Sequence, residues 1–227
     1  MLALAGFGWL ENSGGAGTIG VFANVISELT PFISQAPPSS MRIVTLQDET
    51  KVRVLLSESD IQQGVKRLAD DIAQQYGKEP LTIIGVMTGS IILLADLIRM
   101  LELPLRVGVV QTSSYRSGAE RGELRINDSM MLDIRDRDVL LIDDIFDTGH
   151  TLSRVVDRVQ QLGPSSLRSA VLLSKTGRQE VAYCPDFVTF DIPDEFVIGY
   201  GLDYDDEYRN LPYIGCLDEV PGARASE

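Results

Sequence analysis

The sequence is poor in the residues that build metal clusters and disulfide frameworks. Among its 227 residues only Cys184 and Cys216 are cysteines, and only His150 is a histidine. The two cysteines lie far apart and match neither a zinc-binding pattern nor a disulfide-dense secreted domain. A single histidine excludes a site made of several imidazole ligands. A reducing cytoplasm is the simplest location that this composition predicts.

Basic residues are also scarce. Twenty Lys and Arg against thirty-three Asp and Glu give a formal net charge of −13. A nucleic-acid-binding protein usually carries a basic patch, and no Lys/Arg cluster is present, so we expect no nucleic-acid partner. No apolar run is long enough to span a bilayer, so we expect no membrane partner. An acidic protein can still bind a phosphorylated small molecule through backbone N–H groups or bridging Mg²⁺.

The first forty residues differ in composition from the rest. They contain no Lys or Arg and are rich in Gly, Ala and Ser, and they end in the linker-like run Pro-Pro-Ser-Ser. A secretory signal needs a basic start and a continuous apolar stretch, which Glu11 to Gly15 interrupts. We expect a poorly ordered extension over 1–40, one α/β domain over 41–220 and a short tail over 221–227.

The domain shows strand and helix patterns in alternation. Short apolar runs predict buried strands over 81–87, 105–111, 139–142 and 170–173. Helical spacing predicts helices from a Ser59 cap to Gly77, over 89–101 and over 152–162. This alternation predicts a mostly parallel sheet flanked by helices, with ligands bound at the carboxyl ends of the strands. The polar stretch 113–130 is typical of a mobile lid.

The most informative segment runs from Val139 to Leu152 and reads VLLIDDIFDTGHTL. Asp143 and Asp144 come directly after an apolar strand, where two carboxylates are costly unless they are solvated or neutralised. The functional reading is binding of Mg²⁺ or of sugar hydroxyls, and the alternative is simple exposure at the sheet rim. A nucleotide triphosphatase would need a GxxxxGK[ST] loop, which is absent. A receiver domain would carry such a pair on its first strand rather than past mid-chain.

The segment continues as Asp-Thr-Gly-His-Thr (147–151) and then a predicted helix. Successive backbone N–H groups in a tight turn form an anion-binding concavity, and the helix N-terminus adds a favourable partial charge. Thr148 and Thr151 add hydroxyl donors, and Gly149 permits close approach of the backbone to a ligand. Either threonine as a plain helix cap is the alternative. Together with the acidic pair, the run predicts a cradle for a monophosphate beside groups suited to ribose hydroxyls.

This run resembles the phosphoribosyl pyrophosphate (PRPP) motif of type I phosphoribosyltransferases. From about Arg53 to Leu217 the chain is similar to hypoxanthine-guanine phosphoribosyltransferases. The resemblance implies the type I fold, with a mobile flap and a small base-binding hood on the central sheet. It also implies transfer of ribose 5-phosphate from Mg²⁺–PRPP to a 6-oxopurine, and a homodimer or homotetramer. An enzyme for another base such as xanthine, or a PRPP-sensing regulator without catalysis, remain open.

In the PRPP half of the site the resemblance implies that Asp143 and Asp144 contact the ribose hydroxyls, in part through Mg²⁺. It assigns Asp147 to acid/base chemistry at purine N7. The loop for the 5-phosphate comprises Thr148, Gly149, His150 and Thr151. At His150 the family is variable and often has lysine. A protonated imidazole would favour phosphate there, and plain exposure is the alternative.

In the purine half, the run DEFVIGYGLDY (194–204) resembles the base-binding end of the family. Phe196 matches the aromatic residue that stacks on the base, and Val197 matches a residue whose main chain reads the base edge. Lys175 matches a lysine that donates to the exocyclic oxygen. A lysine donor prefers a 6-oxopurine to adenine, whose 6-amino group is itself a donor.

Around the pyrophosphate, the resemblance makes Asp203 a Mg²⁺ ligand and Arg209 a pyrophosphate contact. Ser114 and Tyr115 match the Ser-Tyr pair of the flap. One departure concerns Thr88 and Gly89 in Met-Thr-Gly-Ser (87–90), where the family usually has lysine in place of Thr88. The family often has a cis peptide before that lysine. We expect backbone donation to pyrophosphate to persist and PRPP binding to be weaker.

Overall fold

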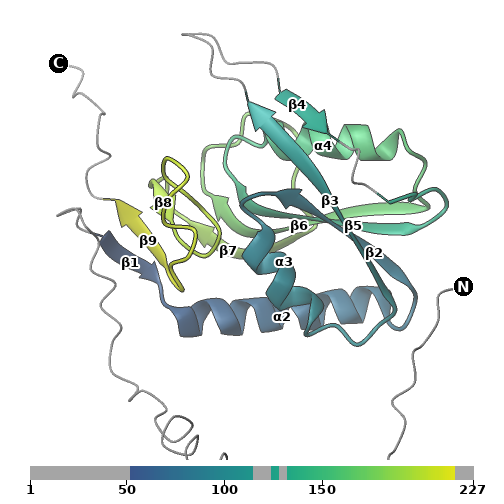
Figure 1. The fold of residues 1–227 in the computed structure, drawn as a ribbon, viewed down its shortest axis with the longest axis horizontal. Helices are drawn as coiled ribbons and strands as arrows, with labels where there is room; N and C mark the ends of the chain where they lie inside the picture. Colours follow the sequence, from purple (N-terminus) through teal and green to yellow (C-terminus); the bar gives the residue numbers. More distant parts are fainter. Residues whose placement is uncertain (1–51, 115–123, 128–131, 218–227) are drawn as a thin grey trace, which may run out of the picture. The chain divides into compact units, whose positions relative to one another are not determined.

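The computed structural model describes residues 52–114, 124–127 and 132–217 (Figure 1). The expected extension over 1–40, the expected tail over 221–227 and Tyr115 lie outside these residues. Within them, no helix combines the length and the apolar character that a membrane crossing needs. Cys184 is exposed and Cys216 is buried, and both are free thiols.

A six-stranded sheet forms the centre of the domain, in the order β4-β3-β2-β5-β6-β7. Its strands are β2 (Leu81–Met87), β3 (Leu105–Ser114), β4 (Leu124–Asn127), β5 (Asp138–Phe146), β6 (Ser166–Lys175) and β7 (Phe187–Ile192). All neighbouring strands are parallel except β3 and β4. The predicted mostly parallel α/β sheet is therefore confirmed.

Helices cover both faces of this sheet (Figure 1). Helices α2 (Glu58–Tyr76) and α3 (Ile91–Ile98) pack on one face, and α4 (His150–Gln160) packs on the other. The predicted apolar stripe of α2 is buried, and it comprises Ile61, Val65, Leu68, Ala69 and Ile72. Because both faces are covered, the central strands carry apolar side chains at nearly every position.

The start of α2 differs from the prediction. Ser57, not Ser59, is the N-cap, and its hydroxyl accepts the backbone N–H of Asp60 at 3.2 Å. The Asp60 carboxylate accepts the backbone N–H of Ser57 at 3.0 Å in return, which completes a capping box. Gly77 ends the helix as predicted, at φ +61°, a conformation that glycine adopts without a steric penalty.

Three strands are longer than expected. Strand β5 continues to Phe146, so Asp143 and Asp144 lie within it rather than after it. Its extension is paired with β6, which itself continues to Lys175. Strand β3 continues to Ser114 and pairs with β4, so the predicted lid stretch contains part of an antiparallel hairpin. Hydrogen bonds to a neighbouring strand keep these polar residues in the sheet, which an apolar pattern cannot reveal.

A second, antiparallel sheet joins the two ends of the described domain. It has the order β1-β9-β8, from β1 (Val52–Leu56), β9 (Ile214–Leu217) and β8 (Val197–Ile198). Val197, Ile214 and Cys216 belong to the same buried cluster as α2 and α3. This small sheet corresponds to the expected hood, and it holds the segment from Phe196 to Arg209 beside the main sheet (Figure 1).

Close packing of α2 on β7 leads to a prediction for Gly64. A Cβ atom there would lie 2.2 Å from the Phe190 ring and 2.8 Å from the Thr189 methyl carbon. Although alanine is the better helix former, overpacking should dominate. We expect Gly64→Ala to lower the free energy of unfolding by about 1–2 kcal/mol in urea denaturation. At the exposed helical position Gln74, substitution by Ala should change it by less than about 0.5 kcal/mol. A more stable Gly64→Ala protein would contradict this packing.

Candidate active site

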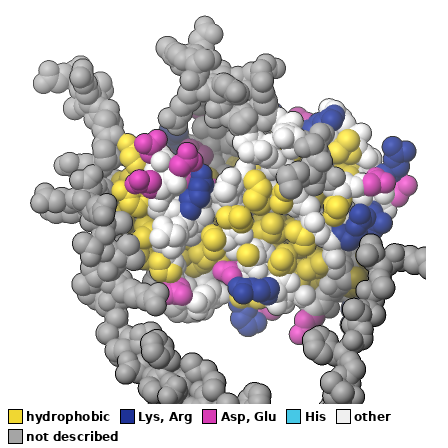
Figure 2. Space-filling model, in the orientation of Figure 1, with side chains coloured by type: hydrophobic (Ala, Val, Ile, Leu, Met, Phe, Trp, Pro, Cys, Tyr) yellow, Lys and Arg dark blue, Asp and Glu magenta, His cyan; other side chains and the backbone are white. Residues whose placement is uncertain are grey.

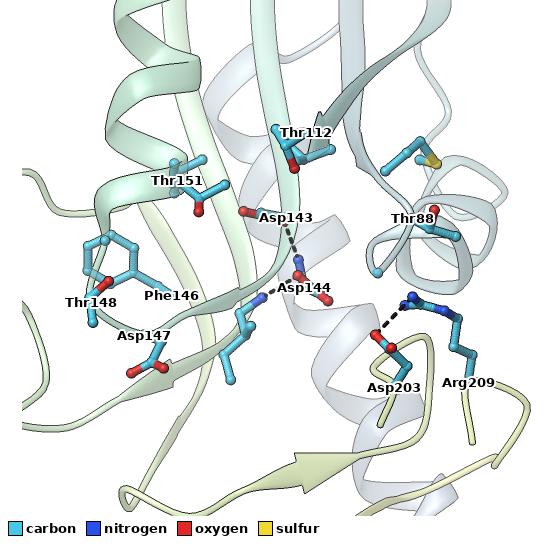
Figure 3. Close-up of a pocket in the computed structure, with 16 residues that line it drawn as sticks. Thr88, Thr112, Asp143, Asp144, Phe146, Asp147, Thr148, Thr151, Asp203 and Arg209 are labelled. Atoms are coloured by element: carbon cyan, nitrogen blue, oxygen red, sulfur yellow. Dashed lines mark hydrogen bonds and ion pairs between the residues drawn. The ribbon is translucent and has the colours of Figure 1, made fainter. Parts of the chain in front are cut away.

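A pocket of about 360 Å³ opens at the carboxyl ends of β2 and β5 (Figure 3). Segments far apart in the sequence line it: the loop after β2, the end of β3, the β5–α4 segment and residues before β9. Ten predicted site residues line this pocket, namely Thr88, Gly89, Asp143, Asp144, Asp147, Thr148, Gly149, Thr151, Asp203 and Arg209. The residues predicted for PRPP and pyrophosphate are thus brought together, with the exception of His150.

The acidic pair lies at the centre of this pocket. Asp143 is buried, with 5 % exposure, and its Oδ1 accepts the backbone N–H of Asp144 at 3.0 Å. Oδ1 of Asp144 accepts the backbone N–H of Ile145 at 2.9 Å. Burial raises the pKa of Asp143 well above its usual value, and the charge of Asp144 raises it further. Burial also raises the pKa of Asp144. The pair is therefore suited to hold a cation or hydroxyl donors, which would relieve this electrostatic cost.

The phosphate-loop segment leads directly into helix α4. Gly149 is the N-cap of the helix at φ +87°, so neither Thr148 nor Thr151 is needed as its cap. A Cβ atom on Gly149 would lie 2.5 Å from Val181 and 2.8 Å from the Phe146 ring, so the turn requires glycine. The two threonines and the start of α4 face the pocket (Figure 3). An anion placed there would meet hydroxyl groups and a helix N-terminus.

His150 does not line the pocket. Its Nε2 lies 2.9 Å from Oε2 of Glu180, and about half of its side chain is exposed. The backbone N–H of Glu180 also donates to the Thr148 carbonyl at 2.9 Å. The imidazole therefore helps to connect the phosphate-loop segment to residues after β6.

The loop after β2 comes unusually close to the acidic pair. The Met87–Thr88 peptide is cis. A Cβ atom on Gly89 would lie 1.7 Å from Oδ2 of Asp144, and one on Gly201 would lie 2.1 Å from the Gly89 carbonyl oxygen. Only glycine at both positions lets the loop, Asp144 and the hood meet.

Arg209 supplies positive charge at the side of the pocket opposite the phosphate-loop segment (Figure 3). Its guanidinium lies 2.8 Å from Oδ1 of Asp203 and donates to the Gly201 carbonyl at 2.8 Å. Within the part of the chain that the structure describes, Arg209 is the one basic side chain among those lining this pocket.

The predicted purine-binding residues lie beside this pocket rather than in its lining. Lys175, at the end of β6, is 8 % exposed, and its Nζ lies 3.5 Å from Oδ2 of Asp147. Phe196 is 41 % exposed and contacts Tyr204 edge to face, with 5.6 Å between ring centroids. Val197 is buried and begins β8. Asp147 thus borders both groups of residues.

Sequence reasoning missed several residues of the site. Pocket-lining residues that it did not select are Val86, Met87, Thr112, Ile145, Phe146 and Leu152. Arg178 and Asp194, which contact Asp147 and Lys175, were also missed. The position of a residue near the carboxyl end of a strand could have identified two of them, because Thr112 and Ile145 lie near the carboxyl ends of β3 and β5. Ser114 ends β3, and Tyr115 lies outside the described residues.

No group of three or more His, Cys, Asp or Glu side chains that could hold a metal ion occurs within 52–114, 124–127 and 132–217. Mg²⁺ is usually held by one or two carboxylates together with oxygens of a phosphorylated substrate. Asp143 and Asp144 are carboxylates of this kind, and their raised pKa values show that a nearby positive charge would be favourable.

Comparison with known proteins gives consistent results. The model of the phosphoribosyl transferase domain family matches residues 54–205. The hypoxanthine-guanine phosphoribosyltransferase of Staphylococcus epidermidis is 42 % identical over 165 residues, which cover 72 % of this chain and 92 % of that protein. The enzyme of the same name from Aquifex aeolicus is 39 % identical over 171 residues, which cover 74 % of this chain and 96 % of that protein. A crystal structure of a hypoxanthine phosphoribosyltransferase from Staphylococcus aureus matches with a TM-score of 0.72 at 38 % identity. The match covers 78 % of this chain and 96 % of the chain in that structure.

The electrostatic cost of Asp143 leads to a prediction about stability and pH. Because its pKa is raised in the folded protein, its contribution to stability is present below about pH 4 and is lost as pH rises through the folded pKa. Asn at position 143 cannot ionise, so Asp143→Asn removes this loss of stability at high pH, and its amide oxygen still serves as the Oδ1 acceptor. Without Mg²⁺ or substrate, we expect it to raise the free energy of unfolding by about 1–3 kcal/mol at pH 7.5, with the difference vanishing near pH 4.

Urea denaturation in the presence of EDTA at several pH values measures this difference. The exposed carboxylate of Asp157 on α4 provides the matched control, and Asp157→Asn should show no comparable dependence on pH. An Asp143→Asn protein that is less stable than the parent at pH 7.5 would show that the carboxylate is not under electrostatic cost.

Proposed function

Because the chain belongs to the phosphoribosyl transferase domain family, we propose that it transfers the 5-phosphoribosyl group of PRPP to hypoxanthine or guanine, giving IMP or GMP and pyrophosphate. The chain is a phosphoribosyltransferase, and the curated relatives reported above carry the name of a purine salvage enzyme. The observation that carries the proposal is the pocket itself. A phosphate-loop segment, the acidic pair of Asp143 and Asp144, and Arg209 surround one cavity, with Lys175 beside it.

The 5-phosphate and ribose of PRPP would occupy the side of the pocket nearest α4. The hydroxyls of Thr148 and Thr151 and the backbone N–H groups after Gly149 would donate to the phosphate oxygens. Asp143 and Asp144, within β5, would accept from the ribose hydroxyls. Such contacts would place the sugar over the end of the sheet, where parallel α/β proteins bind their ligands.

Mg²⁺ would join the acidic side chains to PRPP. Asp143 and Asp144 fit this role because burial makes their unneutralised charge costly, and Asp203 lies on the opposite side of the pocket, beside Arg209 (Figure 3). When bound, the metal would neutralise negative charge on the departing pyrophosphate. Arg209, the Thr88 hydroxyl and the backbone at Gly89 would contact pyrophosphate directly.

The purine would lie against the hood. Phe196 is exposed enough to stack on a base, and the main chain of Val197 follows it at the start of β8. Lys175 and Asp147 place a donor and an acceptor 3.5 Å apart. A 6-oxopurine carries the complementary pair on one edge, the O6 acceptor beside an N7–H donor. Adenine presents an amino donor in place of O6 and would oppose the lysine.

The chemistry would depend on positioning and electrostatics more than on covalent steps. As the bond from the ribose to pyrophosphate breaks, positive charge develops on the sugar beside the acidic pair. Asp147 would take up the N7 proton as the new bond to the base forms. Closure of the flap at Ser114 and Tyr115 would exclude water, which would otherwise hydrolyse the cationic sugar.

We further propose that the protein acts in the cytoplasm as a homodimer or homotetramer. Apolar side chains gather at the centre of the face on which α3 lies (Figure 2). Ile91 begins α3, Met100 follows that helix and Val107 lies in β3, and each is at least 40 % exposed. A second copy of the chain packed there would remove this apolar surface from water.

An assay with four bases tests the proposed function. With PRPP and Mg²⁺, we expect hypoxanthine and guanine to be converted to nucleotides and adenine to be rejected, with xanthine as the fourth base. Activity with xanthine alone would favour the alternative enzyme, and PRPP binding without turnover of any base would favour the regulator. Retention of Lys175 beside Asp147 supports the enzyme over the regulator. As a control, Asp147→Asn should lower kcat sharply and leave PRPP binding largely intact.

The substitution of the family's lysine by Thr88 leads to a separate prediction. The pocket has one basic side chain, Arg209, among its described lining residues, so a second cation should strengthen pyrophosphate binding. We expect Thr88→Lys to lower the KM for PRPP by about 3–10-fold, which corresponds to the net contribution of about one ordinary hydrogen bond. Thr88→Met, which adds length without charge, is the control. An unchanged KM for PRPP in Thr88→Lys would mean that the missing cation does not limit binding.

A further inference from the structure

Four charged side chains of alternating sign form a closed ring beside the pocket. Nζ of Lys175 lies 3.5 Å from Oδ2 of Asp147 and 3.4 Å from Oδ1 of Asp194. Arg178 completes the ring, because its Nε donates to Oδ1 of Asp147 at 3.1 Å and its Nη1 lies 3.5 Å from Oδ2 of Asp194. Each carboxylate therefore directs one oxygen to the lysine and the other to the arginine.

The ring adds side-chain contacts where strand pairing ends, because the β5–β6 ladder stops at Phe146 and Ser174. Asp147 follows β5, Lys175 ends β6, and Arg178 stands three residues later. Asp194 comes from the turn before β8, two residues ahead of the exposed Phe196. Two members of the ring, Asp147 and Lys175, have proposed contacts with the purine. The other two have no role in the reaction as described above.

We propose that Arg178 and Asp194 are positioning residues, which hold Asp147 and Lys175 at the separation that reads the O6 and N7–H edge of a 6-oxopurine. This inference rests on the proposed function. Asp194 neutralises a lysine whose side chain is 10 % exposed, and Arg178 holds Oδ1 of Asp147, the carboxylate oxygen that Lys175 does not contact. The hydrogen bond from Arg178 to Asp147, with the Asp147 charge, raises the pKa of Arg178, so the ring retains its cation.

The expected effect is on rate more than on folding. Arg178, Asp147 and Asp194 are each more than a third exposed, and ion pairs at such exposed positions contribute little to stability. Displacing a reacting group by about 1 Å, in contrast, can cost on the order of a hundredfold in rate. Loss of Arg178 frees one oxygen of Asp147, and loss of the Asp194 charge removes half of the neutralisation of Lys175.

Steady-state kinetics of the full-length protein test the inference. We expect Arg178→Gln and the isosteric Asp194→Asn each to lower kcat/KM for hypoxanthine by about 10–100-fold, while the KM for PRPP changes by less than about twofold. Arg178→Lys should recover part of the loss, because the ammonium retains the charge but not the Nε geometry. The double variant should lose less than the product of the single effects, since both act on one ring.

Arg168→Gln provides the matched control. Arg168 forms a similar half-exposed ion pair with Asp186 at 3.1 Å and does not line the pocket, so the same substitution should leave both kinetic constants unchanged. Thermal unfolding of every variant separates misfolding from misplacement. Asp194→Asn, which keeps the shape of the side chain, remains informative if Arg178→Gln folds poorly.

Three results would overturn the inference. The first is an unchanged kcat/KM for hypoxanthine in both single variants. The second is a rise in the KM for PRPP as large as the loss in kcat/KM for hypoxanthine, which would indicate a general structural role. The third is inactivity of the parent protein with every base, which would remove the proposed function and the inference together. An active parent with unaffected variants would remove the inference alone.

Discussion

The uncompensated negative charge of Asp143 and Asp144 is the constraint on which the rest of the site depends. Burial within β5 raises the pKa of both carboxyl groups, so their ionised forms carry an electrostatic cost that a cation or hydroxyl donors would relieve. The two carboxylates thus lower the stability of the fold and at the same time form a preorganised binding site. The covered parallel sheet makes the exchange possible, because apolar strands on both sides of β5 hold the pair in place.

The second requirement is close approach of separate backbones around that pair. The loop after β2 reaches Asp144 only because Gly89 lacks a side chain, and Gly201 lets the hood reach the same loop. Arg209 is held near them by Asp203 and the Gly201 carbonyl. A side chain at either glycine would therefore displace the loop after β2, because that loop contacts Asp144 on one side and the hood on the other.

Many features of the fold followed from local patterns. The strand over 81–87 and the buried face of α2 agree with the apolar periodicity, which depends only on neighbouring residues. The prediction of Ser59 as the helix cap was wrong. Ser57 caps the helix because it lies three residues before Asp60, the spacing at which the two residues can exchange the hydrogen bonds of a capping box. The ends of β3 and β5 were placed too early, because polar residues there are kept in the sheet by pairing with neighbouring strands.

By itself, the sequence determined the family and the contiguous half of the site, because the acidic pair and the phosphate-loop segment lie within one run from Asp143 to Thr151. Only the tertiary structure decided how distant segments meet. The contact of Gly89 with Asp144 and the ring through Arg178 and Asp194 join residues from different strands and loops. The physical reason is that such contacts depend on packing between elements, on which the order of residues along the chain carries no direct information.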